Sequence, residues 1–207
     1  MTADPDLPVR LLTAALEALK GESADRLSLR RLAQQVGVSH QAPYVHFGGK
    51  REFLAAVAGR GLHQAADEAA AAVAKVGDDP LTRLHALVNA YVRFIESQPH
   101  VLDLVYGPMV AKDDHPTLQN AAIAYWDLVH ATVAACQPAG TSEAEILRRC
   151  AATWGTVYGI ARLTALQQIP ASVPANQGEL LREAVDTLFD GWQARSRRMS
   201  GGGPQHP

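Results

Sequence analysis

Cysteines and long apolar segments are scarce in this chain of 207 residues. Its two cysteines, Cys136 and Cys150, stand outside any C-x-x-C or ligand cluster, so we expect two buried thiols and neither a disulfide scaffold nor a zinc site. A membrane-spanning helix needs a run of about 18 apolar residues, and the sequence contains none. Residues 1–6 lack the apolar segment of a secretory signal. We therefore expect a cytoplasmic protein without a membrane partner.

Catalytic motifs are also missing from the sequence. It contains no G-x-S-x-G, no H-E-x-x-H and no glycine-rich phosphate loop, and its eight histidines are scattered. We expect no enzyme activity, no metal and no cofactor. Aromatic residues make up only 6% of the chain and alanine is abundant, which favours helices, and 47% apolar composition is enough to bury a core. The predicted fold class is all-α.

Residues 28–50 read as two short helices joined by a tight turn. Ser28 is placed as the N-cap of the first helix, and Gly37 can end it in the left-handed conformation. Ser39 can then cap the next helix through its side chain. The apolar face of the first helix is formed by four residues at helical spacing: Leu29, Leu32, Ala33 and Val36.

The second helix is expected to present a polar and aromatic surface outward. Its predicted buried side consists of Ala42 and Val45, continuing from Val38. The opposite side is predicted to carry His40, Gln41, Pro43 and Tyr44. At about eight residues such a helix is too short to be stable alone, so its neighbours must hold it in place.

Basic residues are concentrated around this unit. Residues 26–51 contain five bases and no acid, whereas the rest of the chain has 14 basic and 21 acidic residues, a formal charge of −7. A basic island on an acidic protein favours a phosphate-binding site, although charge alone also fits a solvated helical surface. Together with the turn and the exposed Gln41, His40 and Tyr44, it indicates a DNA-reading helix-turn-helix.

The segment LSLRRLAQQVGVSHQAPYVHFGGKREFLAAV resembles the DNA-binding motif of the tetracycline-repressor (TetR) family, with the likeness covering about residues 8–57. The family pattern Y-x-H-F-x-x-K is present as Tyr44, His46, Phe47 and Lys50. Pro43 is a departure, because the family more often has leucine there. Since proline lacks the N–H group and restricts Ala42, we expect a distorted first turn within an intact helix.

The resemblance implies roles for eight DNA-binding residues. His40 and Gln41 would face base edges, while Tyr44, His46 and Lys50 would lie on or near phosphates. Ser28 would touch the DNA backbone, and Arg30 and Ser39 complete the predicted DNA-binding set. Phe47 would belong to the core.

Helical spacing and breaks predict the remaining organisation. Residues 8–20 form a first helix and complete a three-helix head, so we expect a helix-turn-helix domain over 1–49, a larger ligand-binding and dimerisation domain over 50–196, and a disordered tail over 197–207. The further helices are expected at 51–76, 81–97, 99–106, 116–136, 142–168 and 178–195.

The last two long helices carry apolar stripes that suit a four-helix dimer interface, where this family pairs. The stripes could instead face the protein's own core. The residues in them are Ile146, Cys150, Trp154, Val157 and Ala161, and then Leu181, Val185, Leu188, Phe189 and Trp192. We expect a homodimer through these helices.

The segment W-G-T-V-Y-G, residues 154–159, is similar to the Trp-His-Gly signature of one TetR C-terminal subclass, with Tyr158 where that subclass usually has His. Gly155 and Gly159 each cost a helix about 1 kcal/mol against Ala. They therefore indicate close approach, either of another helix or of a ligand.

Aromatic and polar residues spread over several helices are candidates for an effector pocket or for plain core. They are Tyr91, Phe94, Tyr106, Met109, Trp126, His130, Trp154 and Tyr158. None is formally charged, which favours an apolar or weakly polar organic ligand. The sequence thus predicts a ligand-responsive dimeric repressor of a palindromic operator; a helical protein-binding adaptor and a transcriptional activator remain the alternatives.

Overall fold

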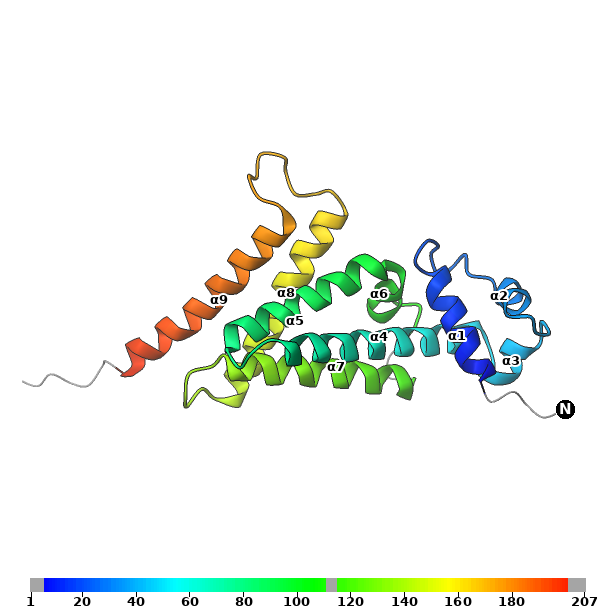
Figure 1. The fold of residues 1–207 in the computed structure, drawn as a ribbon, viewed down its shortest axis with the longest axis horizontal. Coiled ribbons are helices and arrows are strands. Elements are labelled where there is room, and N and C mark those ends of the chain that lie inside the picture. The colour runs from blue at the N-terminus through cyan, green and yellow to red at the C-terminus, as the bar shows by residue number, and fades with distance from the viewer. Residues whose placement is uncertain (1–5, 111–114, 201–207) are drawn as a thin grey trace, which may run out of the picture. The chain divides into compact units, whose positions relative to one another are not determined.

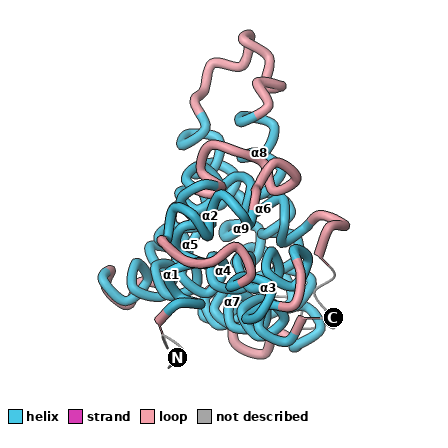
Figure 2. The backbone as a smooth tube through the Cα atoms, turned by 90° about the vertical axis from the view of Figure 1, so that its right-hand side faces the viewer, coloured by secondary structure: helices cyan, strands magenta, loops and turns pink. Residues whose placement is uncertain are grey.

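A computed structural model describes residues 6–110 and 115–200 of the chain, and side chains up to residue 194. Within these residues every regular element is a helix and no strand occurs (Figure 2). The predicted all-α class is therefore confirmed. The helices are α1 (Leu7–Ala18), α2 (Leu29–Val36), α3 (Ala42–Phe47), α4 (Lys50–Lys75), α5 (Pro80–Ser97), α6 (Pro99–Tyr106), α7 (Pro116–Ala135), α8 (Glu143–Ala165) and α9 (Gln177–Ser200).

The chain divides into two compact units. The first takes the described residues up to Asp67 together with those from Arg93 to Trp126, and the second takes Glu68 to Val92 and the residues from Asp127 onward. The predicted boundary between residues 49 and 50 separates a DNA-binding domain from a ligand-binding domain. It stays a prediction, because the compact units do not reveal these functions.

The first unit contains α1, α2 and α3 packed against one another (Figure 1). Leu11 of α1, Leu19 directly after α1, Leu32 of α2 and Phe53 at the start of α4 are almost fully buried. Each such side chain contributes about 1.5 to 3 kcal/mol of transfer free energy. The three short helices of the head are therefore held by a shared core, which they need because none is long enough to be stable in isolation.

The second unit contains α8 and α9, which lie side by side (Figure 1). Much of the predicted interface stripe is buried within this chain, including Cys150, Val157, Ala161, Leu181 and Val185. These residues therefore belong to the core of the unit. Trp154, another member of the stripe, is 38% exposed.

Polar contacts also fix α8 and α9 within the second unit. His85 Nε2 lies 2.8 Å from a carboxylate oxygen of Asp186, and His130 Nε2 lies 2.8 Å from Glu143. Gln193 Nε2 donates to the main-chain oxygen of Cys136 at 2.8 Å. Three contacts between different elements thus set the position of this helix pair.

Helix α9 continues to Ser200, five residues beyond the predicted end at Arg195, and residues 201–207 of the predicted tail lie outside the described residues. No helix among the described residues is long and apolar enough to cross a membrane.

Candidate nucleic-acid interface

Helix α2 begins and ends as its sequence predicts. Ser28 has an extended backbone, and its Oγ accepts a hydrogen bond from the Arg31 N–H at 3.4 Å. Gly37 is left-handed with φ of 80°, and the Val38 N–H reaches the oxygen of Ala33 at 2.9 Å. These contacts satisfy amide groups that a helix end leaves without intrahelical partners. The predicted cap and stop are confirmed.

Helix α3 begins later than expected. Its N-cap is Gln41 without a side-chain capping bond, so the predicted side-chain cap at Ser39 is wrong. The main-chain oxygen of Ser39 instead accepts from the Ala42 N–H at 3.0 Å. Pro43 explains the shift, because proline fits the first helical turn, where its missing N–H costs nothing. The result is a six-residue helix, and His40 and Gln41 precede it in the turn.

The buried side of α3 also differs from the prediction. Pro43 is buried and Val45 is 78% exposed, the reverse of what we expected. Phe47, four residues after Pro43, meets the ring of Phe53 edge-on at 5.0 Å between centroids. Residues four apart share a helix face, and the residue midway between them lies about 200° around the axis. Pro43 and Phe47 thus turn Val45 outward.

The predicted DNA contacts fall on an accessible surface of the head. Tyr44 is 49% exposed. The other exposed members of the set are Arg30, Ser39, His40, Gln41 and His46. Ser28 and Lys50 are half-buried. The turn before α3, the outer side of α3 and the ends of α2 and α4 therefore carry all eight residues within one compact unit.

Arg31 and Lys50, two of the cations in residues 26–51, have partners in the head. Arg31 forms an ion pair with Glu22, a contact that the sequence did not reveal because Glu22 lies outside the acid-free segment. Lys50 Nζ donates to the main-chain oxygen of Asp25 at 2.8 Å. A hydrogen bond from Ser23 lowers the pKa of the Asp25 carboxyl, which keeps a negative charge beside this loop. The positive potential of the island is therefore weaker than residue counting predicts.

The eight candidate pocket residues are divided between the units. Tyr91, His130, Trp154 and Tyr158 lie in the second unit, and Phe94, Tyr106, Met109 and Trp126 lie in the first. The Trp154 indole N–H donates to the Tyr91 hydroxyl at 3.0 Å, so these two expected ligand handles bond to each other. The structure does not test whether any of the eight residues binds a ligand.

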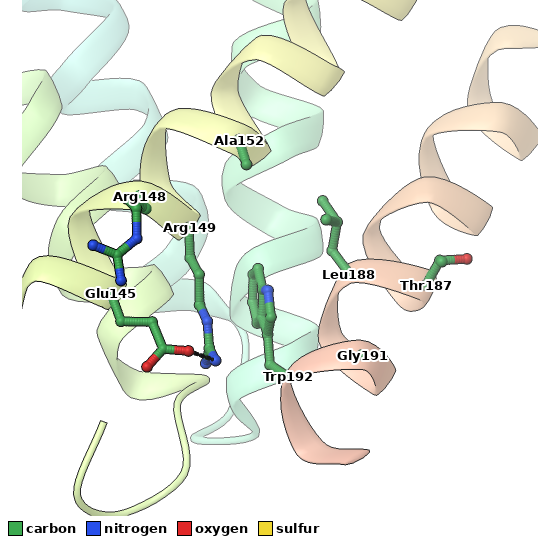
Figure 3. Close-up of a pocket in the computed structure, with 8 residues that line it drawn as sticks. All are labelled: Glu145, Arg148, Arg149, Ala152, Thr187, Leu188, Gly191 and Trp192. Carbon is green, nitrogen blue, oxygen red and sulfur yellow. Dashed lines mark hydrogen bonds and ion pairs between the residues drawn. The ribbon is translucent and has the colours of Figure 1, made fainter. Parts of the chain in front are cut away.

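A cavity of about 350 Å³ lies between α8 and α9 and contains none of these residues (Figure 3). Its lining consists of Glu145, Arg148, Arg149, Ala152, Thr187, Leu188, Gly191 and Trp192. Arg149 is only 8% exposed, is bound by Glu145 and Gln137, and has its guanidinium carbon 5.9 Å from the centre of the Trp192 ring. Sequence reasoning missed this site because a buried arginine is indistinguishable from a surface arginine in a helical pattern.

The close packing expected at the two α8 glycines is absent within the described chain. A Cβ atom added at Gly155 or Gly159 would meet no atom within 4 Å, and the same holds for Gly191 of α9. The described residues of this chain therefore do not supply the close approach that the sequence predicts at these glycines, and the approach of another helix or of a ligand stays a prediction. Their faces are open.

A three-helix head that presents a short second motif helix outward, followed by a larger set of helices, defines a helix-turn-helix DNA-binding regulator. Residues 11–57 match the family described as bacterial regulatory proteins, tetR family, and residues 84–188 match the tetracyclin repressor-like C-terminal domain. The chain belongs to the TetR family of transcriptional regulators, whose members bind DNA and small-molecule effectors and act as dimers.

Solved structures agree with this assignment. A protein with unknown function from Rhodococcus sp. RHA1 is 31% identical, with 92% of this chain and 97% of that chain covered and a TM-score of 0.77. The TetR family regulator PfmR from Thermus thermophilus is 20% identical over 87% of this chain and 97% of its own, with a TM-score of 0.56.

FadR from Bacillus subtilis, solved in complex with stearoyl-CoA, is 11% identical over 88% of this chain and 98% of its own, with a TM-score of 0.67. At 20% and 11% identity, the PfmR and FadR likenesses concern the fold alone. No curated protein sequence matches the chain.

Proposed function

We propose that this protein is a repressor that binds a palindromic operator as a homodimer and is released by a small apolar or weakly polar organic ligand. The observation that carries the proposal is the outer surface of the head, where Gln41, Tyr44 and His46 are exposed beside Lys50 in a segment without acidic residues. Such a surface combines groups that read base edges with groups that hold phosphates.

The open face of α8 supports a dimer. Gly155 and Gly159 have empty space before them, and large apolar side chains flank them around the helix. These exposed side chains are Leu147, Trp154 and Leu163 of α8 and Leu166 directly after it. Small residues flanked by large apolar ones allow a second helix to approach closely and bury area. This face, with Gly191 of α9, is the dimer contact that we propose in place of the buried part of the stripe.

Ligand control would act through α4. It begins at Lys50, with only Gly48 and Gly49 between it and α3, so a movement of α4 would carry the DNA-reading helix with it. A ligand can shift the protein between two arrangements only by its difference in affinity for them, typically about 1 to 3 kcal/mol. The eight candidate pocket residues carry no formal charge, and FadR of Bacillus subtilis was solved with stearoyl-CoA, a ligand with a long apolar part. Both facts favour an effector with an apolar body.

The resemblance of residues 154–159 to the Trp-His-Gly subclass belongs to this proposal. Tyr158 replaces the subclass histidine, and its neighbour Trp154 is already bound to Tyr91. Under the proposed subclass assignment, this segment contributes to effector binding.

Equilibrium binding to duplexes from the region upstream of the gene tests the proposal. Specific binding should weaken steeply as salt rises, because the head releases counterions from phosphates. A helical adaptor that binds only protein would show no duplex retention even at low salt. Once a thermal-shift screen has found a ligand, operator and ligand should weaken each other by the same factor, and two unequal factors would refute the two-state scheme.

A further inference from the structure

Val45 is an exposed apolar side chain on α3, where its neighbours in the sequence carry polar groups. It is 78% exposed and stands between Tyr44 and His46, both exposed. Single exposed apolar residues are common on proteins and mean little by themselves. Here the position matters, because Val45 lies on the outer side of the helix proposed above as the DNA reader.

The orientation of Val45 is fixed by the packing behind it. Pro43 is buried, and Phe47 contacts Phe53 at 5.0 Å, so the opposite face of α3 is anchored at two points one turn apart. Rotating the helix to bury Val45 would expose both anchors. Valine is branched at Cβ and has few side-chain rotamers, so it presents its two methyl groups with little further loss of entropy.

The chemistry of the major groove limits what such a group can recognise. Base edges there carry hydrogen-bond donors and acceptors, and the C5 methyl of thymine is the apolar group among them. Tyr44 and His46 can serve the polar groups and the phosphates. The two methyl groups of Val45, which lie between them, can make an apolar contact with the thymine C5 methyl group alone.

We propose that Val45 reads the C5 methyl group of a thymine in each operator half-site. The inference rests on the proposed function, since it assigns a specificity role within the same DNA surface. Val45 would thereby add a sequence-specific contact that the polar residues of the motif do not make. Its contribution is to the choice of sequence and not to the salt-dependent affinity for any duplex.

Replacing thymine by deoxyuridine tests this directly, because the change removes the methyl group and leaves all base-pair hydrogen bonds. In a synthetic operator, replacing one particular thymine in a single half-site should lower the affinity about fourfold, the factor equivalent to ~0.8 kcal/mol for one buried methyl-sized group. With Val45→Ala, the thymine and deoxyuridine duplexes should bind equally. Val9→Ala, the same change at a 44% exposed valine of α1, should keep the fourfold preference.

Each result is decisive for the inference. The inference would be overturned if Val45→Ala kept the full preference for thymine. It would also be overturned if deoxyuridine at every position left the affinity unchanged, and Val45 would then be free to contact another protein. If Val45→Ala binds too weakly to compare, Val45→Thr replaces it, because threonine keeps one methyl group. Val45→Thr should show a reduced preference for thymine over deoxyuridine, and an undiminished preference would overturn the inference. If the wild-type protein bound no duplex specifically, the proposed function itself would fail first.

Discussion

Lys50 Nζ donates a hydrogen bond of 2.8 Å to the main-chain oxygen of Asp25. The contact joins the first residue of α4 to the loop that follows α1. A lysine ammonium has three donors, so this bond leaves two for a phosphate. Lys50 can therefore hold DNA while its side chain stays fixed to the head.

Lys50→Ala should weaken binding to all duplexes alike, because a cation on a phosphate releases counterions whatever the sequence. The slope of log K against log salt should fall by about 1 per subunit. Lys75→Ala, at the other end of α4, is the matched control and should leave the slope unchanged. A loss confined to the operator would contradict the role of Lys50 as a phosphate contact.

Gln41→Ala should reduce sequence preference more than general affinity. Gln41 is exposed in the turn just before α3, and a glutamine that binds two groups of an adenine contributes about 1 to 3 kcal/mol of discrimination. The measurement is a set of competition assays with single-base operator variants. Unchanged relative affinities would show that Gln41 is not a base reader.

Glu22→Gln should strengthen binding to DNA of any sequence. The change frees Arg31 from its ion pair, and the freed cation can neutralise one more phosphate, so the salt slope should rise by up to about 1 per subunit. Protein stability should change little, since exposed ion pairs contribute about 0 to 1 kcal/mol. Glu17→Gln, which removes an acid of α1 that pairs with Lys20, is the control. Equal salt slopes for Glu22→Gln and the wild type would mean that Arg31 does not face the DNA.

Gly155→Leu should weaken the dimer without unfolding the protomer. The open space at Gly155 accepts the new side chain within the chain, and leucine has a higher helix propensity than glycine. The added bulk would hold a second α8 away. Analytical ultracentrifugation should show a higher dissociation constant for Gly155→Leu than for Ala74→Leu, a change at an exposed residue of α4. Equal dissociation constants would place the dimer contact elsewhere.

Both cysteines should resist alkylation in the folded protein. Burial raises the pKa of Cys136 to about 12 and that of Cys150 to about 11, so neither forms the reactive thiolate at pH 8. In the unfolded chain a thiol has a pKa of about 8.5. The unfolded state therefore loses protons first, and the free energy of unfolding should fall as pH rises from about 9 toward 11.

Iodoacetamide labelling at pH 8 measures this protection. Labelling should be slow in buffer and fast in urea at both positions. Rapid labelling of either cysteine in buffer would contradict the burial of that thiol.

The helix-turn-helix could be predicted from the sequence as far as local signals reach. Ser28 and Gly37 act on groups a few residues away, so the start and end of α2 were predictable. The face of α3 was not, because the buried side depends on where Phe47 finds Phe53 and on the later helix start that Pro43 imposes. Similarly, the pairing of Glu22 with Arg31 depends on how α2 packs near the end of α1.

The helical stripes of α8 and α9 were predictable as apolar, but their partners were not. Helical spacing placed Cys150 and Val185 on the apolar face of their helices. Only the fold shows that this face is buried in the core of the protomer. Gly155 and Gly159 face open space among the described residues. Within the described part of the chain no atom lies within 4 Å of a Cβ added there, and the sequence pattern alone could not predict whether a helix or a ligand meets this face.

Footprinting combined with the stoichiometry of the complex is the most direct test of the central proposal, binding of a dimer to a palindromic operator. Such binding predicts two protomers per site, and two protected half-sites whose centres lie about 34 to 36 Å apart, one turn of DNA, or a multiple of that distance. Protection of a single asymmetric half-site by one protomer would contradict it.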